Sequence, residues 1–98
     1  MLNVSIVLYR PDWEQVSALT HALLQSQRVN RVYWIDNSPQ ATEQLPLQSE
    51  RIQYQHNSTN LGYGAAHNIA IRESIYDNIP FHLVINPDII LDTKELDR

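Results

Sequence analysis

The stretch His82–Asp88, His-Leu-Val-Ile-Asn-Pro-Asp, decides the fold that we expect for this chain. Its apolar centre, 83–85, predicts a short buried strand, because a buried parallel strand is apolar on both faces. Pro87 cannot donate a backbone hydrogen bond to a sheet, so the strand is expected to end there. Asn86 and Asp88 lie two residues apart in an extended segment, so their side chains can point to the same side.

A carboxamide and a carboxylate at the carboxyl end of a buried strand lie where open α/β sheets bind ligands. Their oxygen atoms suit Mg²⁺ or Mn²⁺ carried on a nucleotide diphosphate. Taken alone, the same residues also fit a proline turn with an Asx cap. The rest of the chain bears on this choice.

Outward from this stretch, apolar runs and helical spacing predict an alternation of strands and helices. Residues 3–9 are rich in β-branched side chains and are expected to form a central strand. Residues 13–25 have apolar side chains at helical spacing, with Asp12 as the N-cap. Two more short runs predict strands at 32–35 and 52–55, the latter near a sheet edge because polar residues alternate along it.

The polar segment 40–50 contains a proline and is expected to be a short helix or an irregular crossover. A second helix is predicted over 65–76, ended by an asparagine and a proline further on. Its expected packing side comprises Ala66, Ile69 and Ala70, with Glu73 and Ile75 near it.

This alternation predicts one three-layer α/β/α domain over residues 1–98, with a mainly parallel four-stranded sheet. Its 43% hydrophobic and 18% charged residues fit a globular domain. The net charge of −4 disfavours nucleic-acid binding. We expect no transmembrane segment and a cytoplasmic location, because neither a membrane-length apolar run nor a signal-peptide pattern is present. A Rossmann-type dinucleotide site is disfavoured because no glycine-rich turn follows the first strand.

Four segments carry a resemblance to a known family. They are Val4–Tyr9, Ile35–Ser38, Asn60–Asn68 and Leu83–Asp88. In this order and at this spacing they resemble the nucleotide-binding, N-terminal half of the family 2 glycosyltransferases, which have the GT-A fold. The similarity is greatest to the bacterial rhamnosyltransferase-like branch, which builds surface polysaccharides. The resemblance covers essentially the whole of this chain, and only the N-terminal part of a complete family member.

The resemblance implies that the ligand is a nucleotide diphosphate-sugar linked to UDP or dTDP. Tyr9 would lie beside the base, and Asp36 would accept a hydrogen bond from the imide N–H of the base. Asp36 also fits a plain turn residue after a strand. Asn86 and Asp88 occupy the family's metal position and would hold Mg²⁺ or Mn²⁺ between the two phosphates. An amide at position 86 contributes no charge, which lowers the expected affinity for the metal.

The segment that opens the second helix has its own implied roles. Asn60, Gly62 and Gly64 would let the backbone approach the nucleotide closely, although glycine before a helix is also common without a ligand. Asn68 would face the donor, or else be a solvent-facing amide. His67 stands where many members carry arginine or lysine, and an ordinary helix histidine is its alternative. The other histidines, His21, His56 and His82, are assigned no role.

A complete relative would transfer the sugar with inversion, using a metal and a later carboxylate as general base. No residue of this chain is assigned that catalytic role, so we expect the donor-binding part of a transferase without its acceptor pocket. The alternative is a non-catalytic nucleotide-binding or oligomerising module. The last strand is expected to form an open apolar edge, which favours a homo-oligomer.

Overall fold

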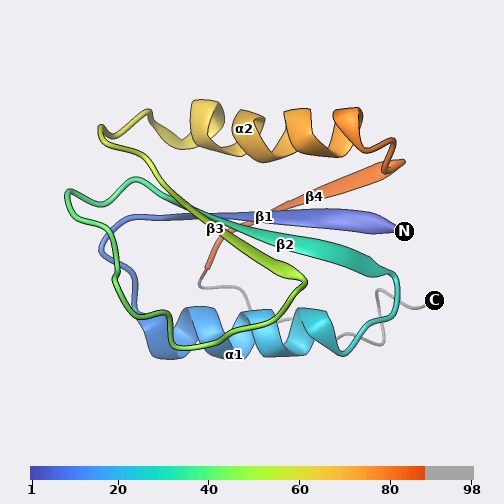
Figure 1. Cartoon of the computed structure of the whole chain (residues 1–98), viewed down its shortest axis with the longest axis horizontal. Coiled ribbons are helices and arrows are strands. Elements are labelled where there is room, and N and C mark those ends of the chain that lie inside the picture. Colours follow the sequence, from blue (N-terminus) through green and yellow to red (C-terminus); the bar gives the residue numbers. More distant parts are fainter. Residues whose placement is uncertain (88–98) are drawn as a thin grey trace.

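The computed structural model describes residues 1–87 and shows a parallel four-stranded sheet between two helices. The elements are β1 (Leu2–Leu8), α1 (Trp13–Leu24), β2 (Val29–Asp36), β3 (Ile52–His56), α2 (Tyr63–Tyr76) and β4 (Phe81–Ile85). The strand order is β3-β2-β1-β4, and every pair is parallel. Helix α1 covers one face of the sheet and α2 the other (Figure 1). The predicted α/β fold is therefore confirmed, with the first strand central and the third at an edge. The expectation that 83–85 form a buried strand is wrong, because β4 lies at the other edge of the sheet and Val84 is 44% exposed.

Most of the apolar core lies between α1 and the sheet. Alternate side chains of β1 point to opposite faces, so Val4, Ile6 and Leu8 pack toward α1. Trp34 of β2 is fully buried in this layer, and its indole Nε1–H donates to Thr20 Oγ1 of α1 at 3.0 Å. The buried members of this cluster are Val4, Ile6, Leu8, Val16, Leu19, Leu23, Val29, Val32, Trp34 and Ile85.

The layer between α2 and the sheet is smaller and more polar. Ala66 and Ala70 are fully buried against a small cluster of β1 and β2 side chains. The buried stripe of α2 continues through Ser74, and Ile75 lies one position beyond it. The expectation that Ile75 and Glu73 lie near the packing side is wrong, because Ile75 is 71% exposed and Glu73 is also exposed.

Local signals in the sequence place the helix ends. Asp12 Oδ1 accepts hydrogen bonds from the backbone N–H groups of Glu14 and Gln15, which confirms the predicted N-cap of α1. Asn78 has a φ of 57°, and Ile79 N–H donates to Ser74 O at 2.9 Å, as in a Schellman C-cap. The segment 40–50 contains no helix or strand, in agreement with the irregular crossover that was one of two expectations.

Four elements begin earlier than expected, namely β1, β2, α2 and β4. Strand β2 starts at Val29, which pairs with Leu2 at the start of β1. Helix α2 starts at Tyr63, so Gly64 lies within its first turn. Strand β2 is longer than expected because its partner strand β1 pairs with Val29. Helix α2 is longer because its first turn includes Gly64, where the local pattern alone predicts a loop.

The side chain of Arg51, at the end of the β2–β3 connection, holds the turn between α1 and β2. The Arg51 guanidinium donates to the backbone oxygens of Leu24 at 2.9 Å, Ser26 at 2.9 Å and Val29 at 2.7 Å. Leu24 O is one of the carbonyls that a helix leaves without an intrahelical partner at its carboxyl end. Arg51 thus caps α1 and fixes the start of β2 together.

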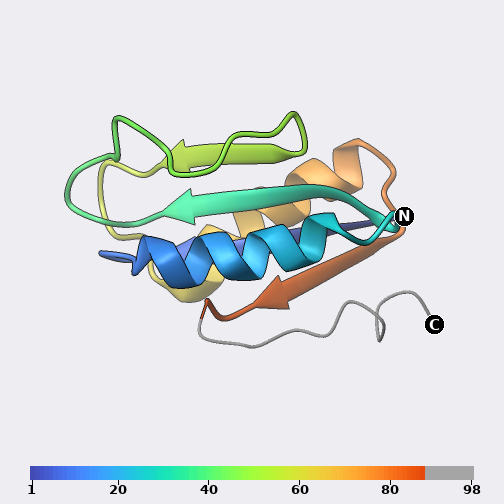
Figure 2. The ribbon, with the colours of Figure 1, turned by 90° about the horizontal axis from the view of Figure 1, so that it is seen from below.

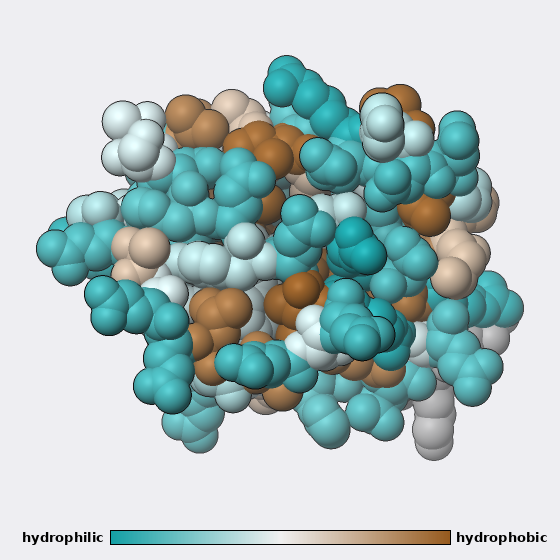
Figure 3. Space-filling view, in the orientation of Figure 1, coloured by the Kyte–Doolittle hydropathy of each residue, from teal (hydrophilic) through white to brown (hydrophobic). Residues whose placement is uncertain are grey.

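The edge formed by β3 faces the viewer in Figure 1, and Figure 3 shows this side covered mainly by hydrophilic side chains. Gln53 and Gln55 are its exposed residues, and polar side chains of this kind discourage pairing with another strand. In residues 1–87, no helix has both the length and the apolar character that crossing a bilayer requires.

Candidate functional site

The carboxyl ends of the four strands lie at one edge of the sheet, where the arrows of β2, β3 and β4 point in Figure 2. The parallel ladder continues one residue past two of these strands. Asn37 N–H donates to Leu8 O and Asn57 N–H donates to Asp36 O, both at 2.8 Å. The strand order changes direction between β1 and β4, and ligands of open α/β sheets bind at such a point.

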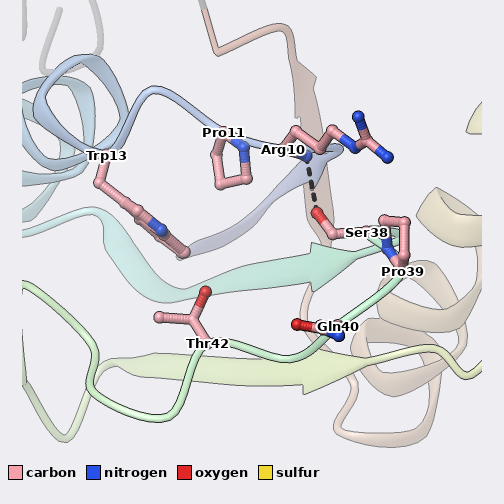
Figure 4. Close-up of a pocket in the computed structure, with 7 residues that line it drawn as sticks. All are labelled: Arg10, Pro11, Trp13, Ser38, Pro39, Gln40 and Thr42. Carbon is pink, nitrogen blue, oxygen red and sulfur yellow. Dashed lines mark hydrogen bonds between the residues drawn. The ribbon is translucent and has the colours of Figure 1, made fainter.

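An open pocket of about 530 Å³ lies at the same edge of the sheet, on the β2 side of β1, between the loop after β1 and the segment after β2. Figure 4 shows Trp13 and Thr42 facing one another from the two segments, while the Arg10 guanidinium is directed away from both. The Trp13 ring packs on Trp34 with the ring centroids 5.2 Å apart, which anchors this wall in the core. The lining residues are Arg10, Pro11, Trp13, Ser38, Pro39, Gln40 and Thr42.

Asp36 holds the second wall of the pocket from behind. Its Oδ1 accepts the Ser38 N–H at 2.9 Å, and its Oδ2 accepts the Tyr54 hydroxyl at 2.6 Å. The Tyr54 oxygen in turn accepts the Thr42 N–H at 3.1 Å. Burial, together with the hydrogen bond to Asp36, raises the pKa of the Tyr54 phenol, so this group stays a donor at neutral pH.

The sequence predicts that Asp36 receives the imide of a base. In the structure Asp36 is fully buried and both of its oxygens already accept hydrogen bonds from the chain. Direct contact with a ligand would require the Tyr54 hydroxyl to move aside. In this arrangement Asp36 supports the residues that line the pocket.

Tyr9 and Arg10 lie at the carboxyl end of β1, as the sequence predicts. Tyr9 is 54% exposed, and the Arg10 guanidinium carbon lies 5.5 Å from the centre of its ring. Arg10 has a φ of 47°, and its N–H donates to Ser38 Oγ at 2.7 Å. This bond joins the ends of β1 and β2 at the mouth of the pocket.

The segment before α2 follows the same edge. Asn60 Oδ1 accepts the Gly62 N–H at 2.9 Å, and Asn37 Nδ2 donates to Gly62 O at 3.3 Å. Gly62 has a φ of 82°, a backbone conformation that is strained for residues with a side chain, so glycine is needed there. Gly64 has no such backbone requirement, and a Cβ atom built on it meets nothing within 4 Å. The backbone is therefore open at Gly64, while Asn68 is exposed one turn further on.

The predicted metal ligands are only partly described. Asn86 follows β4 and is exposed, and its Oδ1 accepts a hydrogen bond from the Tyr63 hydroxyl. Asp88 lies outside the described residues. Within residues 1–87, no cluster of three or more histidine, aspartate or glutamate side chains could hold a metal ion. Of the two predicted metal ligands, the described residues therefore include only Asn86, whose amide oxygen already accepts one hydrogen bond.

His67 turns away from this edge. It is 3% exposed, and its Nδ1 lies 2.6 Å from Ser5 Oγ in the middle of β1. A contact between His67 and a donor phosphate therefore finds no support in this arrangement.

Several residues of the pocket were not singled out from the sequence. Trp13 reads as a core residue of a helix, and Gln40 and Thr42 read as members of a polar crossover. Tyr54, which supports the pocket wall through Asp36 and Thr42, reads as an ordinary residue of an edge strand. Their common signal is position, since each lies within a few residues of a strand's carboxyl end or contacts one that does. A search of protein-family models and a search of curated proteins found no match to this sequence.

Proposed function

We propose that this chain is the donor-binding part of a family 2-like glycosyltransferase, most similar to the rhamnosyltransferase branch, and that it binds a UDP- or dTDP-linked sugar. The observation that carries the proposal is the pocket at the carboxyl edge, between the loops that follow β1 and β2. One wall is an indole and the other offers hydroxyl and amide groups. A flat heterocycle with hydrogen-bonding edges, such as a pyrimidine base, suits these two walls.

The start of α2 supports a place for the diphosphate. Its N-cap makes no side-chain hydrogen bond to the helix, and its first turn contains no acidic residue. The free N–H groups of a helix start favour a phosphate, which matters in a chain with a net charge of −4. The open backbone at Gly64 leaves room for a close approach.

A divalent cation, Mg²⁺ or Mn²⁺, belongs to this proposal. Asn86 and Asp88 would hold it, and when bound it would neutralise charge on the diphosphate. No catalytic residue is assigned, and the acceptor pocket and the general base of a complete transferase would come from elsewhere. The proposed function carries with it a cytoplasmic location.

The two tryptophans allow a sharp test. Trp13 lines the pocket, whereas the Trp34 indole N–H is buried and bonded to Thr20. We expect UDP or dTDP at millimolar concentration to shift the indole N–H signal of Trp13 in a ¹H–¹⁵N spectrum and to leave that of Trp34 in place. Trp13→Phe assigns the two signals, and omission of Mn²⁺ or Mg²⁺ measures the contribution of the metal.

Gly64→Ala is the matched variant for this titration. Alanine is favoured over glycine in a helix by about 1 kcal/mol, so this variant is expected to fold at least as well as the parent. Weakened nucleotide binding in a stable Gly64→Ala protein would show that the ligand reaches the helix backbone. If neither nucleotide shifts Trp13 with or without metal, the donor-binding function is refuted and the interaction module becomes the better reading.

A homo-oligomer through β4 is a separate part of the proposal. Among residues 1–87 the only strand paired with β4 is β1, and Phe81 and Val84 on β4 are 68% and 44% exposed. We expect light scattering after size exclusion to give a dimer or larger mass, and Val84→Lys to give a monomer. Gln53→Lys on the opposite edge is the control and should leave the mass unchanged. A monomeric parent protein at high concentration would contradict this expectation.

A further inference from the structure

Three buried polar side chains and one half-buried histidine join α2 to the middle of the sheet, away from the carboxyl edge. Ser5 Oγ of β1 lies 2.6 Å from His67 Nδ1 of α2 and 2.8 Å from His82 Nε2 of β4. Ser74 Oγ of α2 lies 2.7 Å from His82 Nδ1 and accepts a hydrogen bond from Asn3 Nδ2 at 2.9 Å. We call Ser5, His67, Ser74 and His82 the Ser–His cluster.

One arrangement of protons uses every hydroxyl hydrogen of the Ser–His cluster. Ser74 O–H donates to His82 Nδ1, His82 Nε2–H donates to Ser5 Oγ, and Ser5 O–H donates to His67 Nδ1. Both imidazoles are then neutral Nε2–H tautomers. The reverse arrangement leaves the Ser74 hydrogen without an acceptor among the described residues, because Ser74 would accept from both His82 and Asn3. The first arrangement instead leaves the buried Nε2–H of His67 without a partner in residues 1–87, so each arrangement has one unpaired hydrogen and both keep the two imidazoles neutral.

A second proton cannot be accommodated well. His67 Nε2 is buried and has no hydrogen-bond partner among the described residues. A positive charge on His67 would add repulsion from His82, which shares Ser5 with it. Burial first, and the charge of His82 second, lower the pKa of His67 from 6.5 to about 4, and burial lowers the pKa of His82. At neutral pH both rings are therefore uncharged.

The elements around the Ser–His cluster bring no compensating carboxylate to it. The β1 side chains in contact, Asn3 and Ser5, are uncharged. No carboxylate of residues 1–87 hydrogen-bonds to either imidazole. The titratable groups near this layer are two tyrosines and three charged residues. Tyr63 of α2 contacts the His67 ring. Tyr33 of β2 interacts electrostatically with Arg31, Glu73 and Asp77.

We propose that the Ser–His cluster is a pH-sensitive latch, which holds α2 on the sheet while both histidines are neutral and loosens α2 when they are protonated, with α1 and its core remaining folded. The apolar contacts of α2 are chiefly those of two alanines and a partly buried isoleucine, so the cluster supplies a large part of the attachment. The α1 layer holds ten buried core residues and contains neither histidine.

The direction of the pH effect follows from proton binding. Between pH 6.5 and about 4, a released His67 binds its proton while a docked His67 does not. The free energy that holds α2 on the sheet is therefore greatest above pH 6.5, declines as the pH falls from 6.5 to about 4, and changes no further through His67 below about 4.

Nuclear magnetic resonance on the parent chain tests the latch. At neutral pH, long-range ¹H–¹⁵N spectra should show both His67 and His82 uncharged, and the same spectra distinguish the two proton arrangements. On acidification, the methyl signals of Ala66 and Ala70, on the buried side of α2, should shift or broaden as these imidazoles titrate. The methyl signals of Val16 and Leu23 under α1 should stay in place over the same range.

Variants separate the latch from general acid sensitivity. In the double variant His67→Gln and His82→Gln the α2 methyl signals should lose this pH dependence, whereas His21→Gln, on the exposed side of α1, should keep it. If the double variant does not fold, the parent spectra decide alone. A charged His67 at pH 7, or α1 and α2 methyl signals that change together, would overturn the proposal.

Discussion

Replacing Arg51 by alanine is expected to lower the free energy of unfolding by about 3 kcal/mol, because three partly buried hydrogen bonds are lost at a net contribution of about 1 kcal/mol each. Three backbone oxygens lose their donor in this variant. For a domain of this size such a loss lowers Tm by about 12–24 °C. Urea unfolding followed by tryptophan fluorescence measures it.

Two other arginine changes serve as controls. Arg51→Lys keeps the charge but cannot reach three carbonyls with a planar fork, so we expect about half of the loss. Arg72→Ala removes an exposed arginine from α2 and should change stability by less than about 0.5 kcal/mol. Equal effects at positions 51 and 72 would mean that the contacts of Arg51 contribute little.

The second large effect is expected at Asp36. Asp36→Ala removes the acceptor of the Ser38 N–H and of the Tyr54 hydroxyl in a fully buried setting. We expect a loss of about 3 kcal/mol, from two hydrogen bonds to a charged group and the unpaired donors left behind. The pocket wall formed by Ser38 and Thr42 should loosen as well, so the Trp13 signal should respond less to nucleotide.

Tyr54→Phe separates support of the pocket from direct contact with a ligand. Phenylalanine frees Asp36 Oδ2 without removing the carboxylate. A double-mutant cycle between the two positions should give a coupling of about 1 kcal/mol or more, as for residues in one hydrogen-bond network. If Asp36 binds the base directly, Tyr54→Phe should strengthen binding; if Asp36 acts only as a support, binding should weaken. An Asp36→Ala protein as stable as the parent would contradict the supporting role.

The fold was predictable because its signals are local. β-branched runs, an aspartate N-cap and the Asn-Pro stop after the last strand each act within a few residues, and together they specify alternating strands and helices. The beginning of β2 at Val29 was not predictable in this way, because it depends on the partner strand. The exposure of Ile75 also escaped prediction, since the buried stripe of α2 continues from the correctly predicted Ala66 and Ala70 through Ser74, a polar residue that a hydrophobicity pattern does not mark.

The candidate site was predictable in position and less so in roles. The sequence indicates the carboxyl edge through Tyr9, Asp36 and Asn86, and the structure places all three there. It does not reveal that Asp36 is enclosed by Tyr54, because the two residues are joined only by the pairing of β2 with β3. The Ser–His cluster was missed for the same reason. Ser5 and His82 read as ordinary strand residues until β1 and β4 are side by side.

The unlike faces of the sheet affect which measurements can detect α2 at all. The α1 face buries ten apolar side chains, whereas the α2 face buries Val7, Tyr33 and Ile35 of the sheet together with alanine, serine and histidine. The heat capacity of unfolding responds mainly to newly exposed apolar surface. Detachment of α2 would expose less apolar surface than unfolding of the α1 layer, so a calorimetric transition reports chiefly the α1 layer. Amide hydrogen exchange, which counts opened hydrogen bonds and not exposed apolar area, would show α2 as a separate unit of lower stability.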